Sequence, residues 1–296
     1  MGNDTSSWCT HKNGLPQGSV LAPTLFNLYT NDLPILLVRT FIYADDICCA
    51  TQAETFAELE CTLTADLAQL TRQYCQQWRL KPSVSKTVAL HNTSANRQLN
   101  VLINGLRLAF NPEPIYLGVT LDRTLSFKSH LQKTSVKLKN RNNLLFKLTG
   151  TTWGAQASTL RTLALALCYS VTEYCCPVLL RSSHVGLVNS QLNNAMHLIS
   201  GCVQPMQTPW LHVLANIAPP ALCRRSATDK LLCNIEAHPN WPLYADVFDH
   251  LQKQLVARRA DTTPVDQSAQ GEEDWSSAAV VNSHLVCDPL SWTPSH

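Results

Sequence analysis

Residues 40–51 read Thr-Phe-Ile-Tyr-Ala-Asp-Asp-Ile-Cys-Cys-Ala-Thr, and the fold assignment depends on this stretch. Two short runs of mainly apolar side chains flank the triplet Ala44-Asp45-Asp46. Apolar runs of this length on either side of a polar turn are typical of a β-hairpin. The sequence therefore predicts a hairpin that carries two adjacent carboxylates at its tip.

Adjacent carboxylates repel each other unless a cation joins them. Their oxygen atoms suit Mg²⁺, which also binds phosphate oxygens. Two such ions can hold the attacking and leaving oxygens of a phosphoryl transfer. The simpler interpretation is that Asp45 and Asp46 are ordinary turn residues, because aspartate favours turns. On the dipeptide alone the simpler interpretation is preferred, so the neighbouring segments decide.

The segments before the hairpin favour the metal-site interpretation. Residues 14–20 read Gly-Leu-Pro-Gln-Gly-Ser-Val, and two glycines and a proline in seven residues indicate a shaped loop. Apolar residues at helical spacing predict a helix over Ala22–Leu33, which Pro34 ends. A glycine-rich loop, a helix and the carboxylate hairpin thus follow one another.

The strongest helical pattern follows the hairpin and ends before Pro82. Its apolar stripe consists of Phe56, Leu59, Leu63, Leu67, Leu70, Tyr74 and Trp78. The opposite face carries Glu54, Glu58, Asp66 and Arg72. An amphipathic helix of this kind is predicted to cover a small sheet with its stripe.

Short strands and then helices are predicted for the rest of the chain. Thr87–Leu90 and Ile115–Leu121 are predicted strands, and Val101–Phe110 is a predicted hairpin that turns at Asn104-Gly105. The predicted helices are Phe127–Leu148, two apolar helices within residues 156–200 broken around Pro177, and Pro220–Ile235. The expected fold class is α/β (α+β), with an antiparallel sheet followed by an all-helical region.

Composition sets the limits within which these motifs act. Of the 296 residues, 45% are hydrophobic, which is enough to bury a core. The last 36 residues hold six acids and no Lys or Arg, so the first 260 hold 23 basic and 15 acidic residues. That balance is compatible with a polyanionic partner and equally with an ordinary soluble protein. The stretch Leu163–Leu180 is too short and too polar to span a bilayer.

Twelve cysteines raise the question of disulfides or a metal centre. No Cys-x-x-Cys spacing occurs, and the doublets Cys48-Cys49 and Cys175-Cys176 lie inside apolar runs. Adjacent cysteines in a strand point to opposite faces and cannot hold one ion together. Apolar thiols in a reducing compartment are therefore the preferred interpretation.

Six stretches in register resemble the reverse transcriptases of non-LTR retrotransposons, LINE-like elements near the jockey group. They are residues 14–21, residues 25–34, Phe41-Ile42-Tyr43-Ala44-Asp45-Asp46, Pro82 to Lys86-Thr87, residues 116–122 and the Leu160–Pro177 region. The resemblance covers most of residues 8–235. It implies an RNA-directed DNA polymerase with a partial palm over residues 1–125, a helical thumb and C-terminal region over 126–240, and a polar acidic tail over 241–296 that is expected to be largely disordered.

The resemblance also implies roles for individual residues. Asp45 would bind the catalytic Mg²⁺ (or Mn²⁺), Asp46 would be the neighbouring carboxylate, Tyr43 would face the primer end, and Lys86 would approach the triphosphate. The loop beneath the template and the incoming nucleotide would include Gly14, Pro16, Gln17, Gly18 and Ser19. The primer grip would consist of Tyr116, Leu117 and Gly118. A solvated turn lysine remains nearly as good an interpretation of Lys86, and plain strand packing also accounts for Tyr116 and Leu117.

The implied partners are an RNA template, a DNA primer and deoxynucleoside triphosphates. The family implies a nuclear or cytoplasmic location, and neither a membrane segment nor an obligate protein partner is indicated. The family also places a further metal-binding aspartate upstream of the glycine-rich loop. Before Asp45 the chain has only Asp4 and Asp32, and neither fits that position. We therefore expect the chain to be truncated at its N-terminus and inactive as a polymerase by itself.

Three alternatives to that enzyme remain open from the sequence. The first is a non-catalytic remnant that binds nucleic acid through the basic helix Phe127–Leu148. The second is a product without function. The third, an RNA-templated RNA polymerase, is the weakest, because Tyr-Ala-Asp-Asp replaces the Gly-Asp-Asp usual at that hairpin in viral RNA polymerases.

Overall fold

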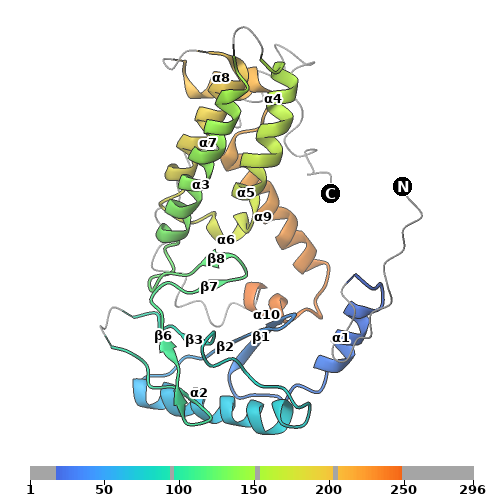
Figure 1. Cartoon of the computed structure of the whole chain (residues 1–296), viewed down its shortest axis with the longest axis vertical. Coiled ribbons are helices and arrows are strands. Elements are labelled where there is room, and N and C mark those ends of the chain that lie inside the picture. The colour runs from blue at the N-terminus through green and yellow to red at the C-terminus, as the bar shows by residue number, and fades with distance from the viewer. Residues whose placement is uncertain (1–17, 94–96, 151–153, 203–205, 249–296) are drawn as a thin grey trace, which may run out of the picture. The chain divides into compact units, whose positions relative to one another are not determined.

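A computed structural model describes residues 18–93, 97–150, 154–202 and 206–248. The chain divides into two compact units, the first ending at Pro114 and the second beginning at Ile115. Figure 1 shows the strands of the first unit and the helices that make up most of the second. The predicted mixture of helices and short strands is confirmed.

The helices of the first unit are α1 (Ala22–Thr30) and α2 (Phe56–Leu70). The hydroxyl of Thr55 accepts the amide hydrogen of Glu58 at 3.2 Å, which starts α2 as a capped helix. The expected continuation of α2 as a regular helix to Trp78 is wrong. The chain widens into a π-helical turn, η1 (Thr71–Cys75), at whose start the Thr71 hydroxyl donates to the Leu67 carbonyl at 2.8 Å.

Among the described residues of the first unit, six strands form three separate two-stranded sheets rather than one. Two are antiparallel hairpins: β1 (Arg39–Tyr43) with β2 (Asp46–Ala50), and β4 (Leu102–Ile103) with β5 (Leu106–Arg107). The third is parallel and joins β3 (Val88–Ala89) to β6 (Ala109–Phe110). The expected single antiparallel sheet is thus corrected, since β3 to β6 are too short to propagate a ladder.

The apolar stripe of α2 contributes to two small cores. One core holds the buried side chains Leu99, Val101, Ile103 and Leu108, against which the stripe packs. Residues Phe56, Leu59, Leu63 and Leu67 supply that packing. The second core combines the end of α2 and η1 with α1 and the segment that follows it. The amphipathic pattern therefore predicted correctly which face of α2 is buried.

The second unit begins with a short hairpin and continues as helices. The hairpin is β7 (Ile115–Tyr116) with β8 (Val119–Thr120), so the prediction of one strand over Ile115–Leu121 is wrong. The helices are α3 (Lys128–Lys147), α4 (Ala157–Ala164), α5 (Ser170–Glu173), α6 (Cys176–Leu179), α7 (Gly186–Ser200), α8 (Thr208–Ala215), α9 (Pro220–Glu236) and α10 (Pro242–Phe248). Of these, α8 and α10 were not predicted.

The core of the second unit lies between α3 and α7, which run side by side in Figure 1. Leu138 of α3 and Leu192 and Met196 of α7 are fully buried there. Asn142 of α3 donates from its side-chain amide to the Gln191 carbonyl at 2.8 Å, which satisfies a polar group within the interface. These contacts stabilise a helical bundle.

The apolar stretch after α4 is irregular. A second π-helical turn, η2 (Leu165–Tyr169), follows α4 directly. The Arg141 guanidinium donates to the carbonyl of Leu167 in this turn. The helix is then interrupted between Glu173 and Cys176, because the ring of Pro177 would clash with the carbonyl four residues earlier. The break predicted around Pro177 is therefore confirmed.

Within the described ranges, no helix is both long and apolar enough to cross a membrane.

Candidate active site

The predicted carboxylates lie at the tip of the β1–β2 hairpin. Tyr43 pairs with Asp46 and closes a two-residue turn formed by Ala44 and Asp45. Ala44 has a φ of +50°, a left-handed conformation that a residue with a Cβ adopts only at a cost. Both aspartates are exposed. The turn therefore presents the two carboxylates to solvent on a backbone held in an uncommon conformation.

Tyr43 lies directly opposite Asp46 in the ladder, so both side chains project from the same face of the hairpin. Tyr43 is 65% exposed, which leaves its ring accessible to a ligand. Ile42 and Ile47 pair in the same way and project from the opposite face. The hairpin thus has an aromatic and acidic face and an aliphatic face.

The base of the hairpin is held by a buried carboxylate on α2. Asp66 is 1% exposed and accepts the amide hydrogen of Val38 at 2.7 Å, one residue before β1 begins. The expectation that Asp66 lies on the face opposite the apolar stripe is wrong. Asp66 is one helical turn from Leu63 and Leu70, and this spacing is the signal in the sequence that could have placed it at the core.

Helix α1, which follows the glycine-rich loop, packs on the same platform. The Tyr29 ring contacts Tyr74 and Trp78, with ring centroids 6.0 and 4.7 Å apart. The Tyr74 hydroxyl donates to the Tyr29 carbonyl at 3.3 Å. Helix α1 and the segment that leads into β1 are therefore both fastened to one continuous stretch, residues 56–78.

Only the end of the predicted loop can be described. Gly18 has a φ of +88°, a conformation that favours glycine. The Ser19 hydroxyl accepts the Leu21 amide hydrogen at 3.3 Å, and its carbonyl accepts that of Ala22 at 3.2 Å, so Ser19 leads into α1. The other proposed loop residues lie outside the described residues. These are Gly14, Pro16 and Gln17.

Lys86 and the proposed primer grip lie on other elements. Lys86 is exposed in the turn before β3, where the Ser83 carbonyl accepts the amide hydrogens of Lys86 and Thr87. Tyr116 ends β7, and Leu117 and Gly118 form the turn to β8. Tyr43, Asp45 and Asp46 thus share one hairpin tip, while Lys86 and the grip residues are positioned by separate turns.

The metal-binding capacity of the tip follows from its ligands. Two exposed carboxylates offer the oxygen atoms that Mg²⁺ prefers. Among the described residues, no group of three or more His, Cys, Asp or Glu side chains is arranged to hold a metal ion. Asp45 and Asp46 can therefore supply part of a coordination shell, with the remaining ligands coming from substrate phosphates, water or other carboxylates.

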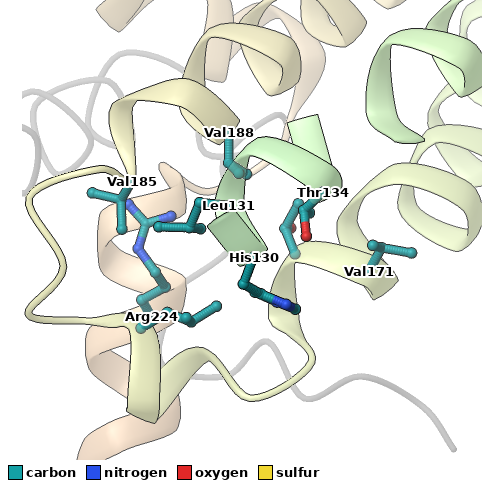
Figure 2. A pocket seen from close by; sticks show the side chains of 9 residues that line it. His130, Leu131, Thr134, Val171, Val185, Val188 and Arg224 are labelled. Carbon is teal, nitrogen blue, oxygen red and sulfur yellow. The ribbon is translucent and has the colours of Figure 1, made fainter. Parts of the chain in front are cut away.

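A cavity in the second unit is too small for a nucleotide. Its volume is about 10 Å³, which corresponds to at most one water molecule. Figure 2 shows side chains from α3, α5, α7 and α9 around it, including Leu131, Val171 and Arg224. The Arg224 guanidinium donates to the Asn189 side chain at 3.0 Å, and burial lowers its pKa. The cavity is a packing feature of the bundle.

The comparisons with protein families and with curated proteins both find similarity to reverse transcriptases. Residues 1–121 match the family described as reverse transcriptase (RNA-dependent DNA polymerase). The chain is 34% identical over 137 residues to the RNA-directed DNA polymerase from mobile element jockey of Drosophila funebris. That alignment covers 43% of this chain and 15% of the relative. Identity to the probable RNA-directed DNA polymerase from transposon BS of Drosophila melanogaster is 32% over 149 residues, with the same two coverages.

A third relative extends the similarity beyond the hairpins. The probable RNA-directed DNA polymerase from transposon X-element of Drosophila melanogaster is 26% identical over 208 residues, covering 67% of this chain and 23% of that protein. The chain thus spans less than a quarter of the length of these relatives. No solved structure matches the chain. Residues 1–121 thus resemble the reverse transcriptase family, and the relatives that the chain matches are RNA-directed DNA polymerases of non-LTR retrotransposons.

Proposed function

We propose that the β1–β2 hairpin is the metal-binding centre of an RNA-directed DNA polymerase that extends a DNA primer on an RNA template. The observation that carries this proposal is the turn itself. Asp45 and Asp46 are adjacent, exposed and fixed by a closed two-residue turn, with Tyr43 opposite Asp46. A rigid turn suits phosphoryl transfer, in which positioning is most of the protein's contribution.

In this proposal each residue has a separate task. Asp45 and Asp46 hold Mg²⁺ or Mn²⁺, which when bound would neutralise charge developing on the triphosphate of the incoming deoxynucleotide. Tyr43 offers an exposed ring to the base or sugar at the primer end. The loop from Gly14 to Ser19 supports the template and the nucleotide. Lys86 attracts the pyrophosphate leaving group.

We also propose that this stretch of chain is at most a weak polymerase by itself. Two carboxylates form an incomplete set for two-metal chemistry, and the described residues supply no third one beside them. In the same proposal, residues 1–125 act as a partial palm, residues 126–240 as a helical thumb and residues 241–296 as a tail.

The metal proposal is tested most directly by Mn²⁺ binding, measured by electron paramagnetic resonance on the full chain. We expect weak binding that is lost in the Asp45→Asn, Asp46→Asn double variant. The matched control is Asp32→Asn, Asp229→Asn, which removes two exposed carboxylates elsewhere. Equal Mn²⁺ binding by the wild type and the hairpin variant would show that the turn is not a metal site.

Polymerase activity is tested on a primed RNA template with deoxynucleoside triphosphates and Mg²⁺. Little extension is expected from the chain alone. Robust extension that disappears in the hairpin variant would confirm the polymerase and refute the proposed incompleteness. A preference for ribonucleotides would instead favour an RNA-templated RNA polymerase.

The outer surface of α3 favours a second function, nucleic-acid binding without catalysis. The helix contains no Asp or Glu, and all five of its lysines are exposed. These are Lys128, Lys133, Lys137, Lys139 and Lys147. Its buried stripe, which includes Leu131, Leu138 and Leu145, carries none of them. A charged outer surface of this kind suits contacts to phosphates.

This second function predicts binding that weakens with salt. In a plot of log affinity against log salt for an RNA–DNA duplex, Lys137→Gln should reduce the slope by about 0.9 if this lysine contacts one phosphate. Lys230→Gln on α9 is the control, because that lysine is also exposed on a helix. If Lys137→Gln changes the slope no more than Lys230→Gln does, the outer surface of α3 is a solvated surface that does not contact phosphates.

A further inference from the structure

The turn of the β7–β8 hairpin has an unusual backbone. Leu117 and Gly118 have φ values of +46° and +78°, so both central residues are left-handed. This pattern matches the two-residue turn that twists with the strands of a hairpin. Glycine adopts it freely, whereas Leu117 does so only against the steric preference of its Cβ. An additional contact would stabilise Leu117 in that conformation.

Tyr174 provides that contact from 57 residues further along the chain. Its hydroxyl donates to the Leu117 carbonyl at 2.6 Å, a short hydrogen bond. A Cβ added to Gly118 would meet the Tyr174 ring at 3.4 Å, so the ring closes one side of the turn. The side chain is 52% exposed, and burial of its ring is therefore not its main role.

Local sequence explains why Tyr174 can reach the turn. Pro177 interrupts the helix after Glu173, and Tyr174 adopts an extended backbone with φ −57° and ψ 123°. Cys175 is left-handed, with a φ of +56°, and leads into α6. The interruption turns Tyr174 away from the helical path. The break around Pro177 and the contact with Leu117 are thus parts of one arrangement.

We propose that Tyr174 is a positioning residue for the primer grip, holding the turn at Leu117 and Gly118 in the conformation that receives the recessed 3′ end of a template–primer duplex. This inference rests on the proposed function and on the primer grip that the family resemblance assigns to Tyr116, Leu117 and Gly118. The hydroxyl orients the Leu117 carbonyl, and the ring limits the movement of Gly118. Backbone groups of an exposed turn can then meet the sugar-phosphate chain in a fixed orientation.

The test uses fluorescence anisotropy on the full chain with two RNA–DNA hybrids of equal length, one with a recessed DNA 3′ end and one blunt. Tyr174→Phe removes only the hydroxyl. We expect it to weaken binding of the recessed duplex about fivefold, the usual effect of one hydrogen bond, and to leave blunt-duplex binding unchanged. Tyr244→Phe is the matched control on α10 and should change neither.

A double-mutant cycle gives a second measurement. Gly118→Ala pushes a methyl group toward the Tyr174 ring and strains the turn. If both residues act through the same contact, the double variant should bind the recessed duplex no more weakly than the poorer single variant. Independent losses that multiply would contradict the inference.

The remaining outcomes separate this inference from the proposed function. If Tyr174→Phe binds both hybrids as the wild type does, Tyr174 does not position the grip. Equal weakening on both hybrids with a lower thermal midpoint would reduce Tyr174 to a stabilising role. If the wild-type chain does not distinguish the recessed hybrid from the blunt one, the grip assignment itself fails, and the inference with it.

Discussion

The β1–β2 hairpin of the first unit and the helical bundle of the second are stabilised in different ways. In the described part of the second unit, sixteen buried side chains form one core, and several of them, such as Leu138 and Leu192, have no exposed surface. In the first unit, the β1–β2 hairpin leaves Phe41, Ile42 and Ile47 between 39% and 46% exposed. The segment that leads into this hairpin is joined to α2 by the hydrogen bond from the Val38 amide to the Asp66 carboxylate. The element that carries the candidate chemistry is thus held by hydrogen bonds, and the helical bundle by apolar packing.

The largest effect should come from the helical core. Leu138→Ala removes a fully buried side chain and leaves a cavity, so we expect a loss of about 3 kcal/mol in the free energy of unfolding. Ile42→Ala, on the exposed face of the hairpin, should cost less than about 1 kcal/mol. Urea unfolding followed by circular dichroism measures both. Equal losses would mean that the hairpin is packed as tightly as the bundle.

The polar anchor of the hairpin should come next. Asp66→Ala leaves the amide of Val38 without its acceptor, and we expect about 2 kcal/mol of local destabilisation. Hydrogen exchange of the backbone amides of residues 36–43 should become faster by the factor that corresponds to this loss of free energy. Asp66→Asn keeps an oxygen acceptor at the same place and is the matched control. If exchange is unchanged in Asp66→Ala, the contact does not hold the hairpin.

The carboxyl of Glu173, in the helical bundle, should change the free energy of unfolding by a comparable amount, and this change should depend on pH. Burial raises the pKa of the Glu173 carboxyl to about 7 from 4.5, and one of its oxygens is buried without a hydrogen-bond partner. The pKa of this carboxyl is higher in the folded state than in the unfolded state. The contribution of Glu173 to folding stability is therefore full below about pH 4.5 and is lost as the pH rises through about 7.

The test of this group is Glu173→Gln, which stays neutral. After allowance for partial screening by solvent, it should unfold with about 2 kcal/mol more free energy than the wild type at pH 8, and nearly equally at pH 4. Thermal unfolding across this range provides the measurement. A constant difference between the two proteins at every pH would mean that Glu173 does not titrate in this window.

The smallest effect should come from the turn that carries the carboxylates. Ala44→Gly relieves the left-handed conformation at φ +50°, and we expect a gain of about 1 kcal/mol or less in hairpin stability. Ala50→Gly in β2 is the control and should be destabilising, because glycine weakens a strand. Amide exchange protection in residues 39–50 measures both. Loss of protection in Ala44→Gly would contradict the strain argument.

The sequence predicted well those turns that depend only on residues close together in the chain. The carboxylate hairpin and the Asn104-Gly105 turn were both visible, because polar turn residues separate short apolar runs. The strand predicted over Ile115–Leu121 was wrong, since Leu117 takes a conformation that leucine rarely adopts. Without that knowledge, Leu-Gly between apolar residues does not indicate a turn.

Contacts between distant segments could not be predicted in this way. Asp66 was placed on the polar face because it is charged, although its helical position borders the apolar stripe. The bond from Tyr174 to Leu117 joins residues 57 apart, and nothing in either neighbourhood indicates the other. Asp122, which accepts the amide hydrogen of Lys128 at the start of α3 at 3.0 Å, was visible only as part of a motif.

The π-helical turn Leu165–Tyr169 also bears on how related chains should be aligned. Such a turn takes up one residue more than a regular α-helical turn over nearly the same rise. A homologue lacking one residue there could continue α4 as an ordinary helix without moving the elements on either side. Single-residue gaps in alignments of this region belong at Leu165–Tyr169, even where similarity scores would shift them into a neighbouring loop.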